Sequence, residues 1–196
     1  MITNDQIWWH LARASGIVAW VLLASSVVWG LLLSTRLLRE VDRPAWLLDL
    51  HRWLGTLTWA TTAVHLATLM ADSFVQFTAA DLFIPFSSSW KPGAIAWGIV
   101  AMYLLVVIQV SSRWMRQLPR PVWHAIHLAS YPTFAMVSIH SFAAGTDAGN
   151  RLFLVLGTSL VVVVGVTTAA RIVLQTGTKR GSQLQRANRP KSRANA

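Results

Sequence analysis

Five long apolar segments dominate this chain of 196 residues and limit what it can fold into. A helix of about 20 apolar residues is long enough to cross the roughly 30 Å hydrocarbon core of a bilayer. With only 12% charged residues, a soluble domain of this size could not cover its surface. The sequence therefore predicts an all-α, polytopic transmembrane helical bundle with five spans, over approximately 7–33, 46–70, 93–110, 122–142 and 152–173.

Basic residues between the spans predict the orientation of this bundle. Short loops rich in Lys and Arg stay in the cytoplasm, so we expect the N-terminus outside, the C-terminus inside and the chain in the cytoplasmic membrane. Because topology accounts for the positive charge, lipid is an expected partner and nucleic acid is not. The residues concerned follow the first, third and fifth spans: Arg36, Arg39, Arg43, Arg113, Arg116, Arg120, Lys179, Arg180, Arg186, Arg189, Lys191 and Arg193.

The domain organisation follows from the same pattern. We expect residues 1–174 to form the bundle and residues 175–196 to form a basic cytoplasmic tail that is disordered. The tail is too short for a dinucleotide-binding unit and lacks its glycine fingerprint, so no flavin or nicotinamide site is expected in this chain. The absence of cysteine excludes disulfides, iron–sulfur clusters and thiolate ligation, which leaves histidine as the obvious ligand.

Five of the six histidines fall on the second and fourth predicted spans. Ionisable side chains at membrane depth are costly and usually functional. His51 and His65 are 14 residues apart, a rise of about 21 Å and a rotation about 40° short of whole turns. His127 and His140 are 13 residues apart, a rise of about 20 Å. Both spans run from inside to outside, so depth pairs His51 with His127 and His65 with His140.

Two imidazoles at each depth predict the axial ligands of two b-type haems, an inner one held by His51 and His127 and an outer one held by His65 and His140. In other interpretations the histidines bond across helices, line a proton path or bind zinc. Zinc would need further carboxylate or thiolate ligands, and Asp49 is the one acid suited to proton pumping.

The helical angle of the fourth span fits this pairing less well than its depth does. On an ideal helix His127 and His140 lie about 140° apart. Pro132 lies between them and is expected to change the local winding, because proline removes a helical hydrogen bond. His124 is a second choice of ligand, but with His140 it gives a rise of about 24 Å, which misses the depth of the second span.

Three further residues are candidates near these sites. Arg13 lies in the outer half of the first span, where a haem propionate or an anionic substrate would balance its charge, unless it snorkels outward beside His10. Arg52 lies at the inner boundary and either contacts an inner propionate or anchors the helix at the interface. Gly55, one turn beyond His51, either leaves room for a porphyrin face or allows close helix packing.

The sequence resembles the ferric reductase-like transmembrane domain shared by ferric reductases, NADPH oxidases and the haem-binding membrane subunit of periplasmic methionine sulfoxide reductase. The resemblance lies in LARASG of the first span, HRWLGTLTWATTAVH of the second and WHAIHLASYPTFAMVSIH of the fourth, within approximately 11–142. It implies that His51, His65, His127 and His140 bind haem, and that Arg13 matches an arginine that helps form the oxygen-reactive site in oxidases. The family usually has six spans, so the missing helix would be a first, non-ligating one.

The sequence thus predicts a dihaem b-type cytochrome that carries electrons from a cytoplasmic or quinol donor to an acceptor at the outer face. It would be the membrane component of an oxidoreductase that needs a separate electron-donor module. The expected donors are a separate flavoprotein, a soluble reductase or quinol, and the expected acceptors are a ferric chelate, oxygen or a protein. The alternatives are a non-catalytic haem-binding membrane anchor or sensor, and a proton or metal transporter.

Overall fold

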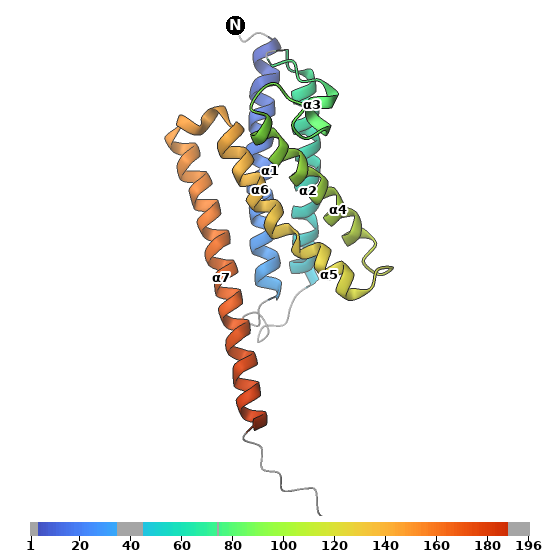
Figure 1. Cartoon of the computed structure of the whole chain (residues 1–196), viewed down its shortest axis with the longest axis vertical. Coiled ribbons are helices and arrows are strands. Elements are labelled where there is room, and N and C mark those ends of the chain that lie inside the picture. Colours follow the sequence, from blue (N-terminus) through green and yellow to red (C-terminus); the bar gives the residue numbers. More distant parts are fainter. Residues whose placement is uncertain (1–3, 35–44, 74, 188–196) are drawn as a thin grey trace, which may run out of the picture.

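The computed structural model describes residues 4–34, 45–73 and 75–187, and within them every regular element is a helix (Figure 1). The prediction of an all-α chain is confirmed. The elements are α1 (Asn4–Ser34), α2 (Ala45–Ala71), α3 (Ala79–Phe83), α4 (Pro92–Arg113), α5 (Arg120–Leu128), α6 (Ser130–Ala144), the 3-10 helix η2 (Thr146–Gly149) and α7 (Arg151–Ala187).

Three helices of the described residues are long and apolar enough to cross a membrane, namely those over Gln6–Ser34, Pro92–Arg113 and Arg151–Leu174. The chain is therefore a multi-pass membrane protein. The second predicted span, α2, is long enough at 27 residues but carries five threonines, two histidines and an Asp–Arg pair. The fourth predicted span is divided into α5 and α6, of 9 and 15 residues, each shorter than a membrane-crossing helix.

The division of the fourth predicted span lies where proline chemistry requires it. Pro132 has no N–H to donate to the Leu128 carbonyl, and its ring crowds that carbonyl. The Ala129 N–H donates to the Ile126 carbonyl instead, over 3.0 Å, and the regular pattern resumes where the Thr133 N–H donates to the Ala129 carbonyl, also over 3.0 Å. The predicted distortion at Pro132 is thus a break between two helices.

The last helix runs further than the sequence analysis expects. α7 continues beyond Leu174 to Ala187, through half of the segment predicted to be a disordered tail. Gln, Lys and Arg are good helix formers and the first proline of this segment is Pro190, so nothing before it ends the helix. The loop arginines Arg36, Arg39 and Arg43 and the last basic residues, Arg189, Lys191 and Arg193, lie outside the described residues.

The apolar core is centred on α1. Trp20 is fully buried, packs edge-on against Phe142 at 5.3 Å between ring centroids, and donates its indole N–H to the Ser138 hydroxyl over 3.1 Å. The described residues of α2 contribute nothing to this cluster, and the buried side chains of α2 are threonines, Thr58 and Thr68. The inner face of α2 is thus left to a cavity. The core comprises Trp20, Leu23, Ala24, Val27, Leu31, Leu105, Phe134, Phe153 and Val164.

Candidate functional site

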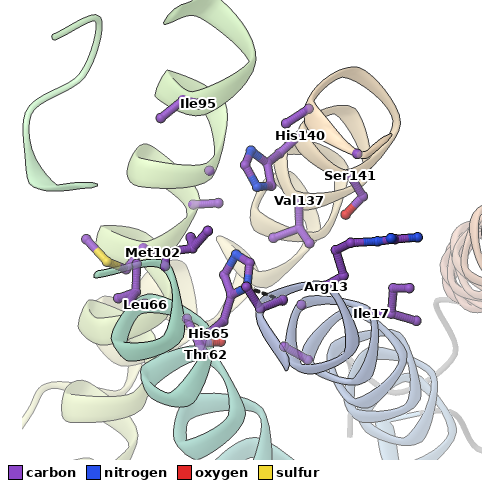
Figure 2. Close-up of a pocket in the computed structure, with 18 of the residues that line it drawn as sticks. Arg13, Ile17, Thr62, His65, Leu66, Ile95, Met102, Val137, His140 and Ser141 are labelled. Atoms are coloured by element: carbon purple, nitrogen blue, oxygen red, sulfur yellow. Dashed lines mark hydrogen bonds between the residues drawn. The ribbon is translucent and has the colours of Figure 1, made fainter. Parts of the chain in front are cut away.

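A cavity lies between α1, α2, α4 and α6, near the end of the bundle that holds the N-terminus. His65 and His140 are on opposite walls and their imidazoles point toward one another (Figure 2). Most of the other lining side chains are apolar, among them Leu66, Ile95, Met102 and Val137. The cavity is therefore a water-poor space with two facing nitrogen bases.

The other two histidines of the candidate set meet at the opposite end of α2. The ring centroids of His51 and His127 are 5.9 Å apart with an interplanar angle of 74°. A metal ion bound by two imidazole nitrogens, each at about 2 Å, needs ring centroids roughly 6 Å apart. Trp123 stacks on His127 at 5.2 Å between ring centroids, and its indole N–H is buried without a hydrogen-bond partner among the described residues. The sequence analysis did not single out Trp123.

Backbone carbonyls orient both imidazoles of the cavity. His65 Nδ1 lies 2.7 Å from the Ala12 carbonyl oxygen on α1, and His140 Nδ1 lies 2.8 Å from the Ala94 carbonyl oxygen on α4. A carbonyl only accepts, so the proton of each neutral ring is on Nδ1 and Nε2 keeps its lone pair. This is the second-shell arrangement of histidines that bind metals in proteins.

Serine hydroxyls take the same place at the other pair. His51 Nδ1 lies 3.5 Å from Ser26 Oγ on α1, and His127 Nδ1 lies 3.4 Å from Ser112 Oγ on α4. These contacts are long for hydrogen bonds. All four histidines thus present Nδ1 to α1 or α4, which leaves Nε2 as the nitrogen available to a ligand.

Glycines on α1 make room for the histidines of α2. A Cβ added to Gly16 would lie 3.1 Å from His65 Cε1, and one added to Gly30 would lie 3.1 Å from His51 Cε1. The two glycines are 14 residues apart, the same interval as the two histidines. This repeated interval was the sequence signal for the histidine-bearing contact between α1 and α2, and the sequence analysis missed it.

The contact between α4 and the α5–α6 pair follows a related pattern. A Cβ added to Gly98 would lie 2.7 Å from His140 Nδ1, closer than side-chain atoms approach one another. Ser112, which contacts His127, is 14 residues after Gly98. An unbroken helix would point the two histidines about 140° apart, but the break at Ala129 lets both contact α4.

Arg13 is on the wall of the cavity and its charge is balanced within the protein. Its guanidinium makes a two-pronged ion pair with Asp147 of η2, in which Nε donates to Oδ2 over 2.8 Å and Nη2 donates to Oδ1. In Figure 2 the guanidinium extends away from the two imidazoles. The sequence could not reveal Asp147, because it is 134 residues from Arg13 in a connection with no motif.

The candidates beside the inner pair have ordinary surroundings. Arg52 Nη1 lies 3.2 Å from Asp49 Oδ1, and both side chains are exposed. A Cβ added to Gly55 would lie 3.3 Å from Gln109 Oε1 on α4, so this glycine faces a neighbouring helix, which supports the helix-packing interpretation.

The two remaining histidines are on the protein surface. His10 is exposed on α1, and His124 is exposed on α5 with its ring centroid 6.3 Å from that of Trp123. No group of three or more His, Asp or Glu side chains in the described part of the chain is placed to hold a metal ion. The candidate ligands therefore come as pairs.

A family model described as ferric reductase like transmembrane component matches residues 8–138, which is more than half of the chain. The chain belongs to the ferric reductase-like transmembrane family. The family match contains His51, His65 and His127 and ends two residues before His140. Ferric reductase-like transmembrane domains generally bind haem, and membership indicates a role in membrane electron transfer. Comparisons with curated proteins and with solved structures gave no significant match.

Proposed function

We propose that this ferric reductase-like chain is a dihaem b-type electron-transfer subunit, with His51 and His127 on an inner haem and His65 and His140 on an outer one. The proposal rests on one observation: four histidines meet in two pairs, and each imidazole turns Nδ1 to a neighbouring helix. A pair of imidazoles suits an ion whose remaining ligands come from elsewhere, as a porphyrin supplies them to iron.

The residues around each pair fit that group. The iron of a bound haem would cycle between ferric and ferrous and so carry one electron at a time. Acceptance by the Ala12 and Ala94 carbonyls makes the outer imidazoles better ligands and fixes their planes. Beside the inner pair, the unpartnered Trp123 N–H is a donor for a propionate. Two imidazoles per iron leave no open position, so an acceptor is reduced at the haem edge.

Five membrane crossings with the N-terminus outside are part of this proposal. The polar composition of α2 does not oppose a crossing, because each of its threonine hydroxyls donates to a carbonyl of its own helix. α5 and α6 cross in series, since residues 120–144 together span about 37 Å. The threonine donors are Thr56, Thr58, Thr61, Thr62 and Thr68.

In this arrangement electrons enter at the cytoplasmic end from a separate flavoprotein, a reductase or quinol. They leave at the outer end to a ferric chelate, oxygen or a protein. Arg13 borders the outer cavity, where its pairing with Asp147 sets the charge that the outer haem and its acceptor meet. Arg52 is the second candidate for an inner propionate, in exchange for Asp49.

Haem content of histidine variants tests the proposal. The purified full chain is expected to hold about two low-spin haems that reduce and then reoxidise with an added acceptor. His65→Ala or His140→Ala should remove the outer haem alone, and His51→Ala or His127→Ala the inner one, whereas His124→Ala should keep both. Reduced haem that no acceptor class reoxidises would favour the anchor or sensor, and a haem-free protein would favour the transporter.

A further inference from the structure

The connection between α2 and α4 ends in an exposed apolar turn. Phe83, Ile84 and Phe86 are 41%, 57% and 73% exposed. The Ser87 N–H donates to the Ile84 carbonyl over 3.3 Å and closes the turn, and Phe86 has a φ of 69°. Glycine is the residue that suits this left-handed position, and a bulky residue there is strained. The chain accepts strain to present an apolar side chain that contacts little of the protein.

The turn lies against the lipid-facing side of a membrane-crossing helix. Tyr103 of α4 donates its hydroxyl to the Phe83 carbonyl over 2.7 Å. Tyr103 is 11 residues after Pro92 in the 22-residue α4, about 16 Å along its axis. Its neighbours on the same exposed stripe are apolar: Val100, Val107 and Val110. In Figure 1, α3 also lies lower along the bundle than the N-terminal end of α1.

Backbone polar groups of the turn are satisfied internally, as a lipid environment requires. Ser87 Oγ lies 2.7 Å from the Ala80 carbonyl oxygen and 2.8 Å from the Ile84 carbonyl oxygen. The Ile84 N–H donates to the Ala80 carbonyl over 2.8 Å, and Tyr103 satisfies the Phe83 carbonyl. An aqueous loop has no need of this local set of partners, because water would supply them.

The start of α3 is polar. Asp81 Oδ2 accepts from the Thr78 hydroxyl over 2.7 Å and from the Thr78 N–H over 2.9 Å, and these bonds lower the pKa of Asp81. A carboxylate held in this way remains ionised and belongs at the level of the headgroups. The connection is therefore amphipathic along its length, with a charged start and an apolar tip.

The opposite side of α3 covers the outer cavity. Leu82 is 4% exposed and lines the cavity together with Phe77 and Trp90, whose rings meet edge-on at 6.1 Å between centroids. We propose that residues 83–86 insert into the outer leaflet at the boundary between headgroups and acyl chains, and thereby hold α3 over the cavity. The partner of this surface is lipid, and the proposal does not depend on bound haem.

Site-directed spin labelling tests the insertion, since the chain has no cysteine. Phe86→Cys and Ile84→Cys are labelled with a nitroxide in the full chain, in nanodiscs of phosphatidylcholine and phosphatidylglycerol. Accessibility to oxygen and to a water-soluble nickel chelate is measured by EPR power saturation. The matched controls are Val107→Cys on the lipid-facing stripe of α4 and Ala148→Cys on the exposed η2.

Insertion predicts an oxygen-to-nickel accessibility ratio at 84 and 86 that is several-fold above that of Ala148→Cys and closer to that of Val107→Cys. A ratio closer to that of Ala148→Cys would overturn the proposal and leave the patch to a protein partner. If Phe86→Cys does not yield folded protein, Ile84→Cys and Phe83→Cys decide by the same criterion. Haem content is measured separately, so a failure here is distinct from a failure of the proposed electron-transfer function.

Discussion

At the scale of single residues, Gly98 is the position where the fold leaves least room. Gly98→Ala would place a methyl group 2.7 Å from His140 Nδ1, so the ring must move and lose its bond to the Ala94 carbonyl. We expect the variant to lose the outer haem and to keep the inner one, which roughly halves haem per chain in a pyridine haemochrome assay. Gly93→Ala, on the same helix with nothing within 4 Å of the added atom, is the control. Full haem content in Gly98→Ala would contradict the role assigned to His140.

The Arg13–Asp147 pair gives a second prediction at this scale. Asp147→Asn leaves the positive charge uncompensated and should raise the reduction potential of the outer haem, whereas Arg13→Ala should lower it, each by some tens of millivolts. The signs differ because a nearby positive charge favours the more negative, reduced haem. Arg13→Lys should recover only part of the effect, because an ammonium lacks the planar fork. Redox titration measures the shifts, and potentials that do not move in any variant would falsify an electrostatic role for this pair.

At the scale of elements, the break between α5 and α6 decides whether both histidines can face α4. Pro132→Ala restores the missing hydrogen bond donor and should join the two helices into one. On that helix His127 and His140 would diverge by about 140°, so one haem should be lost or bound more weakly. Haem content and circular dichroism measure the outcome. Pro92→Ala is the control, since that proline opens α4 at a position where proline is tolerated. Two haems at wild-type affinity in Pro132→Ala would show that the break does not aim the histidines.

At the scale of the whole molecule, the proposed direction of electron flow depends on topology. A reporter fused after Arg193 should be active only in the cytoplasm, and one inserted near Ala148 should be active only outside. The reason is that short loops rich in Lys and Arg are retained inside. Glycosylation or alkaline phosphatase reporters give the measurement, and the reverse pattern would invert the direction of electron transfer.

The properties that follow from local sequence could be read without a structure. Hydropathy over a 20-residue window gave the all-α membrane bundle, because the cost of exposing apolar or backbone polar groups in the wrong medium depends on each segment alone. The rise of 1.5 Å per residue gave the depths of the four histidines, and the chemistry of Pro132 gave a distortion between two of them. The same locality explains the miscount at α2, whose polar composition is balanced by bonds from its threonines to its own backbone.

The properties that depend on neighbours distant in sequence needed the tertiary structure. Asp147 balances Arg13 only because η2 folds back over the end of α1. Gly98 matters because the His140 ring packs on it, and Gly55 packs against a neighbouring helix. The sequence by itself determined the medium, the helices and the depth of each histidine. Which side chains meet at each depth was decided by helix packing, since the contacts depend on how several helices share one space.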